Sequence, residues 1–125
     1  MVMRGDVYLQ EQIRQGLSAQ QAQKRLVGQL QALWQLVFED DAAYTDIFFD
    51  TVFRAEDAMV FEKDGEILSM LFLLAVAFPT DTGVSYQGRY VYAVATHPKA
   101  RGKGYCGALL RKSEEEIAAR GERFA

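Results

Sequence analysis

The Asp64-Gly65 pair is the feature that most restricts how this chain folds. It stands between two apolar runs, AMVFE at 58–62 and ILSMLFLLAVAF at 67–78. A type I′ turn requires positive φ at both central residues, so the sequence predicts two antiparallel strands joined by a tight turn. Because 71–78 is apolar at nearly every position, we expect this strand to be covered on both faces, by helices on one or both sides. The run 67–78 is well short of the roughly 20 residues of a membrane helix.

Two helices are predicted before this hairpin, and together they are expected to form a helical hairpin. Ser18 is a suitable N-cap for the first, which ends near Phe38. Its apolar positions recur at three- and four-residue spacing: Leu26, Leu30, Leu33, Trp34 and Val37. Asp40 or Asp41 is expected to cap the second, shorter helix. The apolar stripe of that helix comprises Tyr44, Ile47, Phe48, Val52 and Phe53.

Three further segments are an unassigned start, a predicted loop and a predicted third strand. The first ten residues show no clear period and are left unassigned, with Val7 to Leu9 as a candidate short strand. Residues 79–88 are predicted to form a loop from their Pro, Gly, Ser and Asp content. A third strand is predicted at 89–96, with Tyr90, Tyr92 and Val94 on one face and Val91, Ala93 and Ala95 on the other.

A last helix is predicted from Gly104 to Arg120, with Gly121 ending it in a left-handed conformation. The residues expected to face inward are Cys106, Leu109, Leu110, Ser113 and Ile117. Residues 122–125 are expected to begin another strand. The whole chain, 1–125, is therefore predicted to be a single domain with an α/β (α+β) fold, in which helices flank a mixed sheet built on an antiparallel hairpin and a third strand.

Composition limits the partners and the compartment. The formal net charge is −3, so no overall positive field would collect nucleic acid or an anionic membrane, and neither is expected as a partner. The single cysteine, Cys106, cannot form an internal disulfide, and no signal peptide is recognisable at the start. We therefore expect a cytoplasmic location.

Glycines and cations gather where the last predicted helix begins. Gly102, Gly104 and Gly107 would leave its backbone N–H groups accessible, and the nearby cations are Lys99, Arg101, Lys103 and Arg111. A helix N-terminus of this kind is suited to binding a pyrophosphate, although glycines that only form the turn are the alternative reading. The segment does not fit a Walker loop. It fits G-x-G-x-x-G literally, but without the parallel βαβ unit that a dinucleotide site requires.

The stretch YVYAVATHPKARGKGYCGALL resembles the acetyl-CoA-binding motif of the GCN5-related N-acetyltransferases (GNAT). In that family a strand ending in V-x-T/V-x-P leads to [QR]-x-x-G-x-[GA] and a helix. Arg101 matches the first motif position and Gly104 the central glycine, whereas Cys106 stands where the family usually has Gly or Ala. The order of the predicted elements also resembles the first half of the family fold.

The resemblance implies acetyl-CoA as co-substrate. Backbone groups at the end of the third strand would pair with the pantetheine arm and hold the thioester carbonyl, and the loop amides would hold the pyrophosphate. The positions assigned to this role are Val94, Ala95, Thr96, Arg101, Gly102, Lys103, Gly104, Tyr105, Cys106 and Gly107. The implied reaction is N-acetyl transfer to a primary amine of a small molecule or peptide.

The catalytic residues remain unassigned. The family's usual general acid, a tyrosine, lies on a later helix, and the chain is expected to cover about the first two thirds of a family domain. An unpaired edge on the third strand would follow, so we expect a homodimer or another partner to cover that edge. The alternative function is a CoA-binding module without catalysis, and a dinucleotide-binding fragment is a third reading. His97, Cys106, Tyr92 and Glu62 are weaker candidates, and Phe48, Phe49 and Phe53 are interpreted mainly as core.

Overall fold

The computed structural model describes residues 1–79, 81–83 and 85–124. A five-stranded sheet has the order β1-β2-β3-β4-β5. Its strands are β1 (Val2–Arg4), β2 (Ala58–Lys63), β3 (Glu66–Pro79), β4 (Ser85–Thr96) and β5 (Arg123–Phe124). The helices are α1 (Gly5–Arg14), α2 (Ala19–Phe38), α3 (Ala42–Thr51) and α4 (Tyr105–Ala119), with short 3-10 turns η1 (Ala55–Asp57) and η2 (Pro98–Ala100). Strands β1 to β4 are antiparallel, and β5 is parallel to β4.

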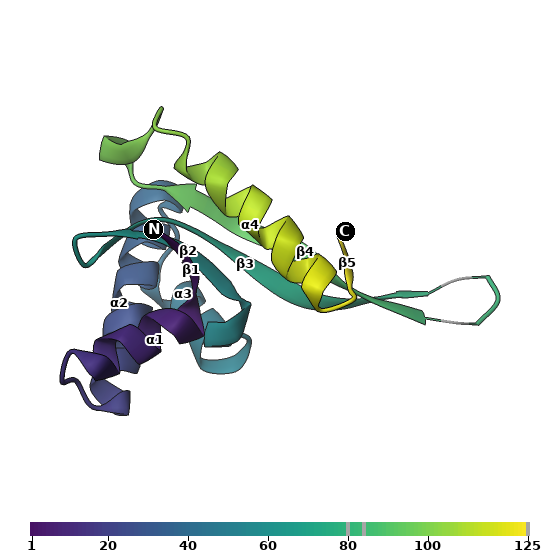
Figure 1. Ribbon diagram of the computed structural model, residues 1–125, viewed down its shortest axis with the longest axis horizontal. Coiled ribbons are helices and arrows are strands. Elements are labelled where there is room, and N and C mark those ends of the chain that lie inside the picture. Colours follow the sequence, from purple (N-terminus) through teal and green to yellow (C-terminus); the bar gives the residue numbers. More distant parts are fainter. Residues whose placement is uncertain (80, 84, 125) are drawn as a thin grey trace.

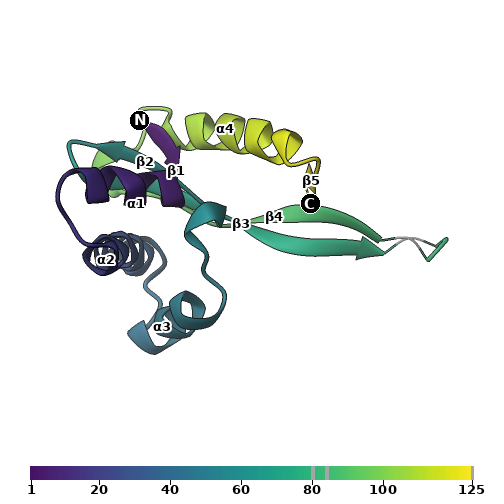
Figure 2. The same cartoon turned by 60° about the horizontal axis from the view of Figure 1, so that its bottom comes forward.

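The sheet separates two layers of helices, as Figure 2 shows: α1, α2 and α3 cover one face, and α4 covers the other. Leu26, Leu30 and Trp34 of α2 pack with Phe72 in the core of the first face. On the second face, Leu109 and Ile117 of α4 pack on the buried side chains of the central strands, Met59, Leu71 and Leu73. The predicted α/β architecture is confirmed.

The predicted hairpin and its two preceding helices are confirmed. The second helix ends at Thr51, however, and Tyr44, Ile47 and Val52 of its predicted apolar stripe are exposed. Asp64 and Gly65 both have positive φ, +53° and +83°, as a type I′ turn requires. Ser18 caps α2, and a capping box joins its hydroxyl and backbone to Gln21. Asp41, the second of the two predicted candidates, caps α3 by accepting from the amides of residues 43 and 44.

The start of the chain differs from the prediction. Residues 7–9 are part of helix α1, and a strand precedes them at Val2–Arg4. The candidate strand at Val7 to Leu9 was therefore wrong. These residues belong to a helix that packs on α2, and its buried face includes Tyr8 and Gln12. Asp6 in the first turn, Arg14 in the last and Gly16 just beyond it are the local signals of this helix.

The long hairpin of β3 and β4 is only partly covered. Its far end extends beyond the helices (Figure 1). Residues 71–73 are buried, but Ala75 and Ala77 are exposed, so the expectation of cover on both faces was wrong for the second half of β3. The predicted loop at 79–88 is also shorter, because the pairing of β3 with β4 continues to Pro79 and Ser85.

Strand β4 contains a bulge that the sequence did not indicate. Tyr92 lies opposite Phe72 and Ala95 opposite Met70, so Ala93 and Val94 together oppose Leu71. Ala93 has φ +53°, which is unusual for a residue with a side chain. Tyr92, Ala93 and Ala95 consequently pack toward α2 and α3, whereas Val91 and Val94 pack toward α4. The predicted alternation was wrong from Ala93 onward for this reason.

Helix α4 and the strand after it largely follow the prediction. Leu109, Ser113 and Ile117 are buried, Cys106 is half-buried, and Leu110 is wrong as an inward residue because 37% of it is exposed. Gly121 has φ +71° just beyond the helix. The strand predicted to begin at 122 is present as β5, which pairs with Gly88 and Arg89 of β4.

A network of partly buried ion pairs joins the far ends of these elements. Asp57 of η1 accepts from Arg89 of β4 at 3.0 Å and from Arg120 at 3.1 Å. Arg89 also pairs with Glu122 at 3.0 Å. The network connects η1, β4 and the C-terminal end of α4. Among the described residues, no helix is both long and apolar enough to cross a membrane.

Candidate functional site

The glycine-rich segment forms the N-terminus of α4. Strand β4 ends at Thr96, and the turn η2 follows, held by the His97 imidazole, whose Nδ1 accepts from the Lys99 amide at 3.2 Å. Gly102 and Gly104 have φ +81° and +77°, and a Cβ added to either would meet no atom within 4 Å. Both glycines therefore permit the backbone path and leave open space in front of it.

The first turn of α4 has free hydrogen-bond donors. Gly104 is the N-cap and has no side chain to cap the helix. Among the described residues, the amides of 102 to 107 have no acceptor. Unsatisfied amides at a helix N-terminus carry partial positive charge and attract anions. The segment is thus a set of preorganised donors around an accessible turn.

A groove of about 400 Å³ lies directly against these donors. Its lining residues are Thr96, Ala100, Arg101, Gly102, Gly104, Tyr105 and Cys106. Six of the ten predicted co-substrate residues therefore lie together around it. Gly107 is not among the lining residues, and its missing Cβ would point toward the Arg111 guanidinium, 3.4 Å away. Gly107 thus lies in the first turn of α4 outside the lining of the groove.

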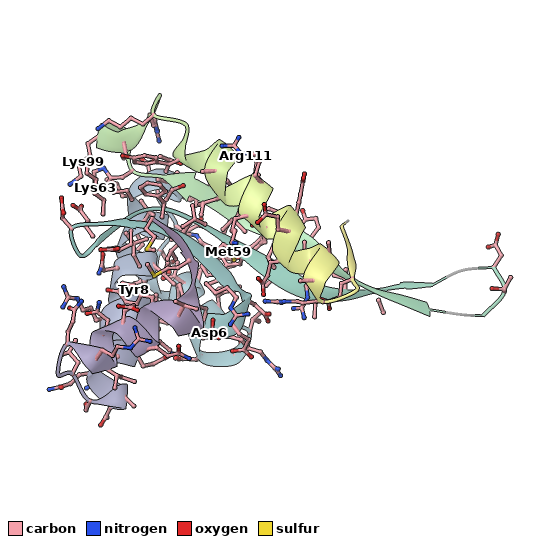
Figure 3. All side chains as sticks on the ribbon, in the orientation of Figure 1. Asp6, Tyr8, Met59, Lys63, Lys99 and Arg111 are labelled. Atoms are coloured by element: carbon pink, nitrogen blue, oxygen red, sulfur yellow. The ribbon has the colours of Figure 1, made fainter. Side chains whose placement is uncertain are left out.

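Positive side chains surround the groove. Within the described part of the chain, Arg101 and Lys103 form no ion pair, and both are exposed. Lys99 instead pairs with Glu66 at 2.7 Å, and this contact holds the pKa of the Glu66 carboxyl below its ordinary value. Figure 3 shows Lys63 and Lys99 at the end of the molecule where η2 lies, and Arg111 on α4. Lys63, Lys99 and Lys103 line an adjacent hollow.

Strand β4 offers a free edge beside the groove. Strand β5 pairs with β4 only at Gly88 and Arg89, so among the described residues 90–96 have no strand on that side. The predicted unpaired edge of the third strand is therefore confirmed for residues 90–96. The prediction was wrong for Arg89, which pairs with β5. The predicted homodimer or partner at this edge stays a prediction.

Thr96 directs its backbone groups toward this free edge. The His97 amide donates to the Leu68 carbonyl at 2.7 Å, and Thr96 lies opposite Ser69. In an antiparallel ladder the residue next to a hydrogen-bonded one points its amide and carbonyl the other way. The buried Ser69 hydroxyl fixes the end of the strand, with 3.1 Å to the Ala95 carbonyl and 2.9 Å to the Thr96 hydroxyl.

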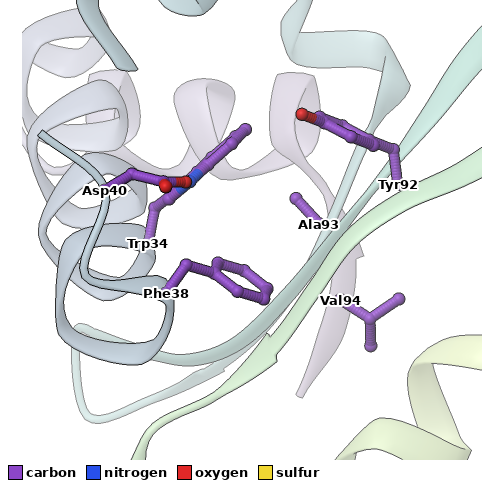
Figure 4. A pocket seen from close by; sticks show the side chains of 6 residues that line it. All are labelled: Trp34, Phe38, Asp40, Tyr92, Ala93 and Val94. Atoms are coloured by element: carbon purple, nitrogen blue, oxygen red, sulfur yellow. The ribbon is translucent and has the colours of Figure 1, made fainter. Parts of the chain in front are cut away.

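A second pocket, of about 280 Å³, opens at the bulge on the α2 and α3 side of the sheet. Figure 4 shows its lining: Trp34, Phe38, Asp40, Tyr92, Ala93 and Val94. Asp40 accepts from the Trp34 indole N–H at 2.8 Å. The Val94 side chain points to the other face of the sheet. Val94, one of the predicted co-substrate residues, therefore borders this pocket at the backbone of the bulge. Ala95 is buried in the core of the first face.

Two phenols meet beside this second pocket. The Tyr92 and Tyr44 hydroxyls are 2.8 Å apart. This hydrogen bond, together with burial, raises the pKa of Tyr92 to about 12, so the phenol is neutral at ordinary pH. Glu62, the other polar candidate, lies elsewhere: its carboxylate accepts from the Gly65 amide at 2.6 Å in the hairpin turn.

Trp34, Phe38 and Asp40 are pocket residues that the sequence did not single out. From the sequence, Trp34 was interpreted as a core position, Phe38 as the end of a helix and Asp40 as a candidate helix cap. An aromatic pair one turn apart, with carboxylates immediately after it, is the signal that could have drawn attention to the end of α2. Phe48 is buried in the core as predicted, 5.0 Å from the Trp34 ring centre.

Sequence comparison identifies a family for most of the chain. A family model described as an acetyltransferase (GNAT) domain matches residues 18–125. No curated protein matches the chain in sequence.

Several solved structures share the fold. A GCN5-related N-acetyltransferase from Anabaena variabilis is 20% identical with a TM-score of 0.67, over 76% of this chain and 24% of that one. A probable N-acyltransferase from Enterococcus faecalis is 18% identical with a TM-score of 0.68, over 79% and 25%. A ribosomal-protein-alanine N-acetyltransferase from Brucella melitensis is 15% identical with a TM-score of 0.57, over 100% and 76%. The chain thus spans about a quarter of the first two proteins.

Proposed function

This chain belongs to the GNAT acetyltransferase family, and from that premise we propose that it binds acetyl-CoA and transfers the acetyl group to a primary amine. The single observation that carries the proposal is the arrangement at the end of β4. An uncapped helix N-terminus, a free strand edge and a bulge that opens on a pocket occur in one short segment of the chain, residues 93–107. Each of the three suits a different part of an acyl-CoA.

The pyrophosphate would lie on the amides of 102 to 107. These donors have no acceptor among the described residues, and Gly102 and Gly104 leave the approach to them open. Hydrogen bonds from amides to an anion are stronger than those between neutral groups. Arg101 and Lys103, which form no ion pair with any described residue, add exposed positive charge at the rim. The residues present therefore fit a diphosphate.

The pantetheine arm would pair with the free edge of β4. An extended arm with amide groups can add to a sheet edge as another strand would. Thr96 directs its amide and carbonyl to that side, and the bulge at Ala93 and Val94 turns the strand just before it. In this arrangement the arm runs from the groove toward the pocket at the bulge.

The bound thioester would supply an activated acetyl group at the bulge. The chain must hold the thioester carbonyl by backbone donors and bring an amine nitrogen to it without its extra proton. Thr96 supplies backbone groups on the free edge, whereas Ala95 pairs with Met70 of β3, and the pocket at the bulge supplies space for the amine. We assign the general acid to no residue of this chain. A cytoplasmic location belongs to the same proposal.

Two titrations and one turnover assay test this function. Calorimetry with CoA and with pantetheine separately is expected to show binding of CoA at micromolar to low millimolar concentration and much weaker binding of pantetheine, which lacks the pyrophosphate. Mass spectrometry of a panel of amines incubated with acetyl-CoA is expected to show acetylated product. CoA binding without any product would identify a CoA-binding module instead. A folded chain that does not bind CoA would contradict both.

A further inference from the structure

The pocket at the bulge has a chemistry of its own. We propose that it binds a small apolar primary amine as its ammonium ion, with Asp40 as the anchoring anion and the aromatic walls holding the apolar part. This inference rests on the proposed function in that it names the class of acceptor. It is argued from the lining residues of the pocket.

Asp40 has an oxygen to spare. One carboxylate oxygen, Oδ2, accepts from the Trp34 indole at 2.8 Å, which fixes the orientation of the group. Within the described part of the chain, Asp40 forms no ion pair, and its other oxygen receives no hydrogen bond. No Lys or Arg is among the lining residues of the pocket. Asp40 is solvent-exposed beside the pocket. A carboxylate that is held in one orientation and has no cation partner favours a cationic ligand there.

The walls around this carboxylate are aromatic and apolar. Trp34, Phe38 and Tyr92 line the pocket, and Ala93 lies against them on the β4 side (Figure 4). Aromatic faces attract an ammonium group, and they also remove apolar surface of a ligand from water. Tyr92 is the other polar lining group, and its hydroxyl is engaged with Tyr44 at 2.8 Å. The walls therefore favour an alkyl or arylalkyl group over one that carries several hydroxyls.

The size of the pocket limits the acceptor further. Its volume of about 280 Å³ is just below the roughly 300 to 1,000 Å³ typical of pockets for drug-sized ligands. A monoamine such as phenethylamine is of suitable size, whereas a polycationic oligosaccharide is too large. Asp40 and the bulge residues Ala93 and Val94 line the same pocket. An amine held by Asp40 is thereby held beside the site proposed for the thioester.

Trp34 reports on this pocket directly. It is the only tryptophan in the chain, and its indole donates to Asp40. We would titrate the protein with phenethylamine, with its neutral isostere 2-phenylethanol and with the hydrophilic ethanolamine. Each titration follows Trp34 fluorescence, with calorimetry in parallel, in the presence and absence of CoA. We expect phenethylamine to bind at least about tenfold more tightly than either comparison compound.

Two matched variants test whether the Asp40 carboxylate is responsible for phenethylamine binding. Asp40→Asn keeps an oxygen that can accept from Trp34 but removes the charge, and it should lower phenethylamine affinity about tenfold. Asp50→Asn removes an exposed carboxylate of α3 outside the pocket and should leave affinity unchanged. Circular dichroism checks that both variants fold.

The other outcomes overturn the inference. Equal affinity for 2-phenylethanol, or no effect of Asp40→Asn, contradicts the carboxylate anchor. Equal affinity for ethanolamine contradicts the apolar walls, and no saturable binding by either method contradicts the site. CoA binding is measured separately. If the amine binds and CoA does not, the proposed function fails and the pocket remains, whereas the reverse result refutes only the inference about the pocket.

Discussion

Substitution of Gly104 by alanine tests whether this glycine serves anion binding or only the turn in which it lies. Gly104 has φ +77°, and an added Cβ would meet no atom within 4 Å. The methyl group therefore has two effects: it strains a left-handed backbone, and it occupies the space in front of the free amides. Only the second concerns a ligand. A control that reproduces the first effect alone distinguishes the two.

Gly121 provides this control at the opposite end of the same helix. Its φ is +71°, and a Cβ there would likewise meet no atom within 4 Å. A left-handed residue with a side chain costs about 1 to 2 kcal/mol, so Gly104→Ala and Gly121→Ala should destabilise the fold by similar amounts. For a chain of this length that corresponds to a fall in Tm of about 4 to 8 °C.

The two variants should differ in CoA binding. An amide hydrogen bond to a charged group contributes about 1.5 to 3 kcal/mol, so blocking about two of them removes about 3 to 6 kcal/mol. This predicts at least about a 100-fold loss of affinity for Gly104→Ala. Gly121→Ala should bind as the unchanged chain does. Thermal unfolding and calorimetric titration with CoA measure both quantities below the lower Tm.

The reasoning is refuted by either of two results. If Gly104→Ala binds CoA normally, the glycine serves only the turn, and the amides of α4 do not hold the ligand. If both variants lose affinity equally, the loss reflects general destabilisation of the helix.

Three further predictions follow from other parts of the molecule. Gly107→Ala should raise stability by about 0.5 to 1 kcal/mol with CoA affinity unchanged, because the position is helical and its Cβ would point toward Arg111 and not into the groove; calorimetry and thermal unfolding check this. Asp57→Asn should lower the free energy of unfolding in urea by about 2 kcal/mol, since it removes the anion that two partly buried arginines share. The pKa of Tyr92 is about 12 in the folded chain and 10.0 for an ordinary tyrosine. The neutral Tyr92 phenol therefore contributes fully to the free energy of unfolding below pH 10, and this contribution falls as pH rises toward 12. Tyr92→Phe should reduce that alkaline loss, by at most about 2.7 kcal/mol, in urea unfolding at successive pH values.

The elements that local chemistry specifies were predictable from the sequence. Asp64-Gly65 adopts the turn that its composition favours, and Ser18 and Asp41 cap the helices that follow them. The groove at α4 was located by its glycines and cations, and six of the residues predicted for it line it. Each of these features depends on interactions within a few residues.

The features that depend on distant contacts were not predictable. Ala93 has no intrinsic preference for positive φ. Its conformation follows from the bulge, where β4 has one residue more than β3 and pairs with β3 both before and after it. The same bulge reverses which face Val94 occupies. Helix α1 was missed because its buried face includes Gln12, a polar residue that an apolar pattern does not count.

The pocket at the bulge was missed for a related reason. Asp40 follows α2 in sequence as one of several acidic residues, and only the fold brings it beside Ala93. Trp34 was read correctly as a core residue, yet its indole N–H also orients the carboxylate that borders the cavity. A residue with both roles has no separate signature in the sequence.

The central claim is that the free amides at the start of α4 hold the pyrophosphate of CoA. Protein labelled with ¹⁵N-glycine gives resonances from only ten residues, so the amides concerned can be followed individually. Addition of CoA is predicted to shift the amides of Gly102, Gly104 and Gly107 and to leave those of Gly16 and Gly28 in place, while pantetheine leaves all five nearly unchanged. Unmoved resonances of the three loop glycines at saturating CoA would contradict the claim.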